Sequence, residues 1–179
     1  MPESVLLIID VQLGLDDPSF GKRNNPAAER NMARLLDQWR KRHLPVVHVR
    51  HDSTEPASTL RPELPGNAIK PEVTPLDNEP LFAKNVNSAF IGTGLEQYLR
   101  DHHYQDLTVV GLTTDHCVST SVRMAANLGF TVTLVSDATA TFERTTKSGQ
   151  WFSADQMHDI NLASLDGEFC TVLTTDEVL

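Results

Sequence analysis

A run of apolar residues near the start of the chain restricts its fold more than any other feature. Residues 5–9 read VLLII without a polar interruption, and Asp10 follows directly. Continuous hydrophobicity, rather than an alternation of apolar and polar residues, is typical of a strand buried on both faces. Strands of this kind occur in parallel sheets that helices cover on either side. The run therefore predicts an α/β protein.

The rest of the chain alternates between strand-like and helix-like segments, which predicts an open, mostly parallel sheet with helices on both faces. Residues 51–80 hold six prolines, which exclude a regular helix or an inner strand there. Residues 138–152 are polar and predict a loop. We expect further strands over residues 46–50, 81–84, 107–110, 130–135 and 169–173, and helices over residues 26–43, 95–102, 117–128 and 154–165.

Length and composition fit one domain over residues 1–179, of which 40% are hydrophobic and 22% charged. The net charge of −9 argues against binding to nucleic acids or to anionic membranes. No apolar run reaches the roughly 18 residues of a membrane span, and no basic leader precedes the first strand. Because the chain has only two cysteines, Cys117 and Cys170, we expect a cytoplasmic protein with reduced thiols.

Three chemically active side chains fall where a parallel sheet would bind a ligand, beyond the carboxyl ends of its strands. Asp10 follows the first strand, Lys84 ends the strand 81–84, and Cys117 lies in the turn after residues 107–110. A helix N-terminus favours the thiolate of a cysteine, and partial desolvation would make Asp10 a suitable general base. A lysine beside both groups would lower their pKa values and stabilise negative charge in a transition state.

Each of these residues also has a structural explanation. Cys117 can equally well be a small buried apolar residue, as free cysteines usually are. Asp10 can cap the next turn, and an isolated lysine such as Lys84 is most often solvated. Packing is the better explanation for Cys170, which lies in an apolar strand.

Metal and nucleotide motifs are absent from the sequence. His48 and His51 would lie on opposite faces of a regular strand, and neither CxxC nor HExxH occurs. The glycine-rich loops GxGxxG and GxxxxGK[ST] are missing as well. We therefore expect no metal and no cofactor.

Four ordered segments together resemble the isochorismatase-like cysteine hydrolases. They are LIIDVQ at residues 7–12, Lys84 with SAF at 88–90 and TGL at 93–95, GLTTDHCV at 111–118, and DATA at 137–140. The resemblance spans nearly the whole chain. It implies a three-layer αβα fold with a six-stranded sheet, usually in dimers or tetramers. It also implies a catalytic triad of Asp10, Lys84 and Cys117.

The resemblance also implies a reaction. In the amidases of this family, which include nicotinamidases and N-carbamoylsarcosine amidases, the cysteine attacks a carbonyl carbon bonded to nitrogen. The aspartate moves the proton, and water then releases the acid from an acyl-enzyme. A cis peptide bond is common before the nucleophile, here between Leu112 and Thr113. It would aim the backbone N–H groups of Thr113 and Cys117 at the oxyanion.

Two departures from family patterns narrow the substrate. Isochorismatases cleave a vinyl ether and typically lack this cysteine, so Cys117 favours hydrolysis of an amide, ureido or carbamoyl bond. Nicotinamidases carry an Asp-x-His metal pair that residues 48–52, HVRHD, do not reproduce, so the resemblance implies no metal. Two alternatives remain open: a vinyl-ether hydrolase that does not use the thiol, and an inactive oligomeric binding member of the family.

Three residues are candidates to contact the substrate. Gln12 and Phe20 follow the first strand, and Trp151 is a large aromatic residue in a polar loop. The alternatives are ordinary packing for Phe20 and anchoring of the loop for Trp151. We expect a small-molecule substrate, no nucleic-acid or membrane partner, and a homo-oligomer.

Overall fold

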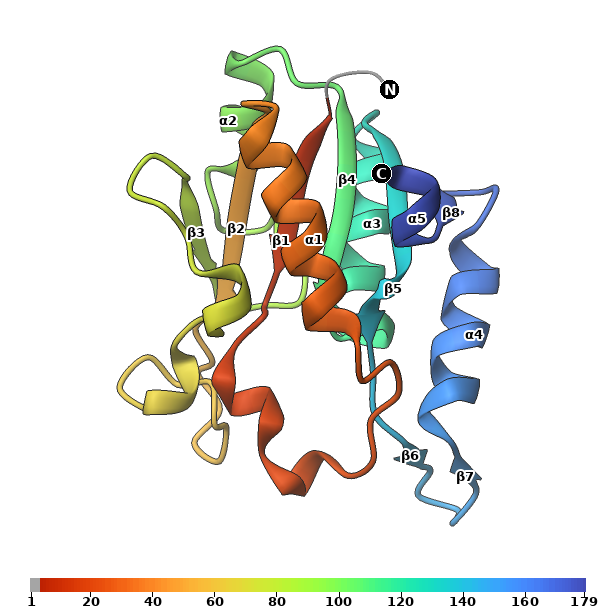
Figure 1. Cartoon of the computed structure of the whole chain (residues 1–179). Coiled ribbons are helices and arrows are strands. Elements are labelled where there is room, and N and C mark those ends of the chain that lie inside the picture. The colour runs from red at the N-terminus through yellow and green to blue at the C-terminus, as the bar shows by residue number, and fades with distance from the viewer. Residues whose placement is uncertain (1–3) are drawn as a thin grey trace.

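The computed structural model describes residues 4–179, which form a six-stranded parallel sheet between two layers of helices (Figure 1). The order across the sheet is β3-β2-β1-β4-β5-β8, and every neighbouring pair is parallel. The fold class predicted from the sequence is therefore confirmed. The strands are β1 Val5–Ile9, β2 Val46–His51, β3 Leu81–Lys84, β4 Asp106–Leu112, β5 Thr131–Ala140 and β8 Thr171–Leu173.

Helices α1 and α5 cover one face of the sheet, and α2, α3 and α4 cover the other (Figure 1). Within residues 4–179, no helix is both long enough and apolar enough to cross a membrane. The helices are α1 Ala28–Lys41, α2 Leu95–Asp101, α3 Ser119–Asn127, α4 Ala154–Leu165 and α5 Thr175–Val178.

The central position of β1 explains its continuous hydrophobicity. Val5, Leu7 and Ile9 pack in the cluster that includes α2, α3 and α4, whereas Leu6 and Ile8 pack in the cluster with α1. Each of these five side chains is at most 2% exposed. Burial of one such side chain contributes about 1.5–3 kcal/mol, so this strand anchors both helical layers.

Gly111 allows β4 to pass close to β1 near the carboxyl ends of the strands. Its φ is +134°, and a Cβ atom there would lie 2.1 Å from the carbonyl oxygen of Ile9. The pairing of β4 with β5 shifts at this point, because Val109 pairs with Leu134 whereas Gly111 pairs with Thr139. The extra residues of β5 bulge out of the ladder, and β4 continues into the turn that carries Cys117.

The structure differs from the sequence-based expectation in two segments. The helix expected from Cys117 begins at Ser119, because a π-helical turn over Thr114–Val118 precedes it. Residues 138–152, expected to be a loop, hold the end of β5 and a hairpin of β6 (Arg144–Thr145) and β7 (Trp151–Phe152). Strands of two residues are too short for an alternating pattern to reveal them.

We expect Gly111→Ala to lower the free energy of unfolding by about 3 kcal/mol or more, because the new Cβ would meet the backbone of Ile9. Urea denaturation against the wild type measures this loss. Gly129→Ala is the matched control, since Gly129 also has a positive φ, +90°, but no atom within 4 Å of the added Cβ. Equal losses in the two variants would show that the approach of β4 to β1 is not a packing constraint.

Candidate active site

Asp10, Lys84 and Cys117 meet at the carboxyl ends of β1, β3 and β4. The Lys84 Nζ donates a hydrogen bond to Asp10 Oδ2 at 2.6 Å and lies 3.3 Å from Cys117 Sγ. The side chains of Lys84 and Asp10 are 0% and 2% exposed. Three distant segments of the chain thus form one buried cluster that contains an acid, an ammonium and a thiol.

The element that each residue ends or follows determines its position. Asp10 follows β1 with a φ of +53°, a left-handed conformation that aspartate tolerates better than most residues. Lys84 is the last residue of β3 and pairs in register with His51 of β2. Cys117 lies in the π-helical turn that connects β4 to α3.

His51 is a fourth member of the cluster, which the sequence analysis considered only as a metal ligand. Its Nδ1 lies 3.0 Å from Lys84 Nζ. Because an ammonium group offers only hydrogens, Nδ1 is the acceptor and the ring is neutral. Burial, together with the Lys84 charge, lowers the pKa of His51 and favours the same state. Asp10, His51 and Cys117 therefore accept the three hydrogens of Lys84.

Burial determines the protonation of the acid and the thiol. Desolvation raises the pKa of Asp10, although Lys84 opposes this effect. Desolvation and the negative charge of Asp10 raise the pKa of the Cys117 thiol. Both effects oppose the thiolate that a helix N-terminus would favour. Cys117 precedes α3 and is partly buried beside a carboxylate, and this environment favours the protonated thiol.

Ligand atoms of Asp10, His51 and Cys117 lie within 4.8 Å of one another, a grouping that could hold a metal ion. The Lys84 Nζ contacts all three groups, at 2.6, 3.0 and 3.3 Å. The ammonium already places a positive charge at the centre of this grouping. These residues do not fit a metal ion while Lys84 holds that position.

A cavity of about 200 Å³ opens onto Cys117. Small-molecule sites commonly enclose about 300–1,000 Å³, so the cavity suits a small ligand. Thr113, which follows a cis peptide bond after Leu112, forms part of the wall. The wall consists of Asp10, Leu15, Phe20, His51, Ser58, Leu60, Asn87, Leu112, Thr113, His116, Cys117 and Arg144.

Of the three expected substrate contacts, only Phe20 lines the cavity, where its ring stacks on Phe142. Gln12 does not line the cavity, contrary to expectation. It is fully buried, and its amide forms hydrogen bonds with the backbone of His51 and Asn67. It joins the end of β1 to β2 and to the proline-rich segment. Trp151 is 57% exposed, donates a hydrogen bond to Glu143, and lies outside the cavity wall.

The sequence analysis missed polar wall residues, among them Asn87, His116 and Arg144. Arg144 Nε donates a hydrogen bond to Asp115 Oδ2 at 3.0 Å. Asn87 Oδ1 lies 3.9 Å from Cys117 Sγ. The available signal was position: each follows a predicted strand at the edge where parallel sheets bind ligands.

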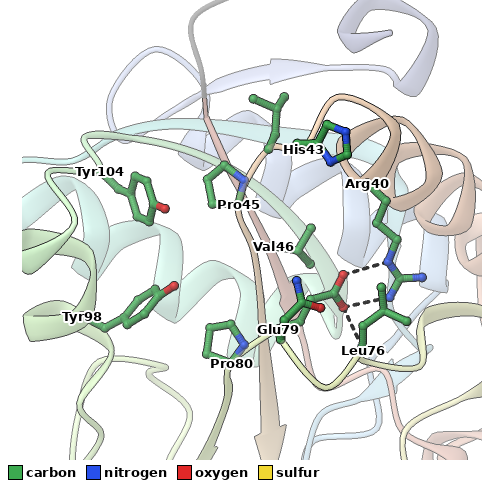
Figure 2. A pocket seen from close by; sticks show the side chains of 11 residues that line it. Arg40, His43, Pro45, Val46, Leu76, Glu79, Pro80, Tyr98 and Tyr104 are labelled. Atoms are coloured by element: carbon green, nitrogen blue, oxygen red, sulfur yellow. Dashed lines mark hydrogen bonds and ion pairs between the residues drawn. The ribbon is translucent and has the colours of Figure 1, made fainter.

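A second cavity, of about 380 Å³, lies at the opposite end of the strands (Figure 2). Pro45 and Pro80, which directly precede β2 and β3, form part of its wall. The charged groups of this cavity pair with one another. Glu79 accepts two hydrogen bonds from Arg40, both at 2.8 Å, and Nε2 of buried His48 lies 2.9 Å from Glu79 Oε2. This arrangement ties α1 to the beginning of the strands.

The chain matches known proteins over nearly its whole length. The model of the isochorismatase domain family matches residues 4–177. The isochorismatase family protein YrdC of Bacillus subtilis is 44% identical over 177 residues, which cover 99% of this chain and 95% of YrdC. Nicotinamidase 3 of Arabidopsis thaliana is 25% identical and covers 98% of this chain and 86% of its own length.

A solved structure has the same fold. It is that of an isochorismatase-family protein from Chromobacterium violaceum. It superposes with a TM-score of 0.95 at 50% sequence identity and covers 98% of this chain and 91% of its own. From the match to the family model, the relatives and the shared fold, we conclude that this chain belongs to the isochorismatase family of hydrolases.

Proposed function

We propose that this protein is a cysteine hydrolase that cleaves an amide, ureido or carbamoyl C–N bond of a small molecule. The observation that carries the proposal is the contact of the buried Lys84 Nζ with both the Asp10 carboxylate and the Cys117 sulfur, at 2.6 and 3.3 Å. The thiol faces a small cavity, where a carbonyl carbon can reach it. A relative named as a nicotinamidase supports amide chemistry, whereas cleavage of a vinyl ether needs no thiol.

In this proposal Cys117 is the nucleophile and Asp10 its general base. As sulfur attacks the carbonyl carbon, its proton passes to Asp10, and the C=O electron pair moves onto oxygen. Asp10 Oδ1 is buried and, within the described residues, has no hydrogen-bond partner, so it is free to accept that proton. The raised pKa values suit this step, because Asp10 is a stronger base than a solvated carboxylate and the thiol stays protonated until attack.

The tetrahedral intermediate then collapses. The C–N bond breaks, Asp10 returns the proton to the leaving nitrogen, and a thioester joins the acyl group to Cys117. Water attacks the thioester carbonyl while Asp10 accepts a proton from it. The C–S bond breaks, sulfur regains the proton, and the product leaves as an acid. Lys84 stays charged throughout and holds the Asp10 carboxylate in place.

The backbone N–H groups of Thr113 and Cys117 are the proposed donors to the oxyanion. Both residues line the cavity; Thr113 directly precedes the π-helical turn over Thr114–Val118, and Cys117 lies within it. Backbone donors fixed in a water-poor site stabilise developing charge without reorganising. Loss of one oxyanion donor typically costs about 2.7–4 kcal/mol of transition-state stabilisation.

Cys117→Ala should lower turnover by about a thousandfold or more, because no other sulfur of residues 4–179 lines the cavity. The measurement is ammonia or amine release from a panel of small amides, ureas and carbamoyl compounds. Cys170→Ala is the matched control, since Cys170 is buried in the core beside α3 and α4, and it should retain turnover. Undiminished activity in Cys117→Ala would remove the thiol from the mechanism and favour vinyl-ether cleavage.

The pH profile of alkylation tests the resting state of the sulfur. Because burial raises the pKa of Cys117, its reaction with iodoacetamide should rise only above the range of an ordinary thiol, about pH 8.5. Asp10→Asn removes the neighbouring negative charge and should shift the profile to lower pH. Rate constants from intact mass and peptide mapping, with N-acetylcysteine as reference, measure the shift. Rapid labelling of the wild type at pH 6 would contradict the protonated thiol.

A further inference from the structure

The cavity wall carries a second charged group that the cleavage chemistry does not use. We propose that the Arg144 guanidinium binds a carboxylate on the substrate, so that the enzyme acts on small anionic amides, ureas or carbamoyl compounds. This inference rests on the proposed function and names the class of its substrate. It follows from how Arg144 is held and from the charges around it.

A buried acid holds Arg144 by one edge. Its Nε donates to Asp115 Oδ2 at 3.0 Å, and the Asp115 side chain is 4% exposed. A guanidinium has five N–H donors in a planar fork, and this bond uses one of them. Over residues 4–179, the two Nη groups make no hydrogen bond to the protein, although Arg144 forms part of the cavity wall. The fixed fork can therefore receive a bidentate anion.

The Asp115 carboxylate does not oppose an anion in the cavity. Asp115 is not part of the cavity wall, whereas Arg144 is. Both Asp115 oxygens are also occupied, because Oδ1 accepts a hydrogen bond from the Thr141 hydroxyl and Oδ2 accepts one from Arg144. Asp115 thus orients the guanidinium from behind.

The remaining charges in the wall favour an anionic ligand. Lys84 neutralises Asp10 at 2.6 Å, and Arg144 is the other charged group of the wall. Its Nε pairs with Asp115, which lies outside the wall, whereas its Nη groups make no hydrogen bond within residues 4–179. The imidazole of His116 adds a polar group next to it, with Nε2 3.6 Å from Asp115 Oδ2. The whole chain carries a net charge of −9, so a guanidinium with free donors in the cavity wall contrasts with the overall charge of the protein.

Arg144 and Cys117 reach the cavity from different elements, the β6–β7 hairpin and the turn after β4. Leu15, Phe20 and Leu60 provide apolar wall. This fits a substrate that places a carbonyl at the sulfur, a short apolar segment against these side chains, and a carboxylate at the guanidinium. A neutral amide would leave the Nη groups without a charged acceptor.

Protection of Cys117 from iodoacetamide tests the inference without requiring turnover. The probes are the acid monoamides malonamate, succinamate and glutaramate, which vary in length, each compared with its neutral diamide. We expect at least one acid to protect Cys117 at a concentration about tenfold below that of its diamide, because hydrogen bonds between a carboxylate and a guanidinium are charge-assisted and stronger than those of a neutral amide. Peptide mapping assigns the label to Cys117.

Arg144→Gln should abolish the advantage of the acid, and Arg144→Lys should retain part of it, since lysine keeps the charge and loses the fork. Arg34→Gln is the matched control, because it removes an exposed pair with Asp176 at 2.7 Å, outside the cavity wall, and should change nothing. If Arg144→Gln does not fold, the comparison of acids with their diamides in the wild type still tests the carboxylate site.

Equal protection by acids and diamides, protection by neither, or an advantage of the acid that survives in Arg144→Gln would each overturn the carboxylate site. Failure of the proposed cleavage would appear separately, as absence of turnover on the amide panel while the acids still protect Cys117. Turnover that depends on Cys117 without preference for acids would leave the cleavage mechanism standing and remove only the carboxylate site.

Discussion

A buried ammonium whose three hydrogens meet three acceptors is the interaction on which the site depends. Lys84 reaches Asp10, His51 and Cys117 at 2.6, 3.0 and 3.3 Å. These groups come from separate strands and the turn after β4, and only a parallel sheet brings the carboxyl ends of β1, β2 and β3 to one edge. Breaking a buried ion pair by removing one partner typically costs about 3–5 kcal/mol, so each member stabilises the positions of the others.

The same burial shapes the chemistry. Desolvation raises the pKa of Asp10 and of the Cys117 thiol together, which favours a protonated thiol beside a carboxylate that is more basic than a solvated one. A preformed thiolate would react with oxidants and other electrophiles whenever they entered. In the proposed mechanism, deprotonation is coupled to attack on the carbonyl, which confines reactivity to a seated substrate.

The sheet positions the reactive groups, and the connecting segments form most of the cavity wall. The strands and Gly111 position the acid, the ammonium and the turn of the sulfur, whereas the wall of the cavity comes largely from connections. The proline-rich segment supplies Ser58 and Leu60, and the hairpin after β5 supplies Arg144. Residues on such connections vary in sequence more easily than core residues do, which allows the same reaction to be carried out on different substrates.

The sequence by itself determined the parallel sheet, because an uninterrupted apolar run such as β1 is stable only when both faces are buried. It also placed Asp10, Lys84 and Cys117 near one edge of the sheet, since each ends or follows a strand. The expectation of dimers or tetramers stays a prediction. Only the tertiary structure decided that His51 joins the cluster, that the Gln12 amide bonds the backbone, and that burial raises the pKa of the Cys117 thiol. Desolvation and hydrogen bonds between distant segments leave no periodic signal in a chain.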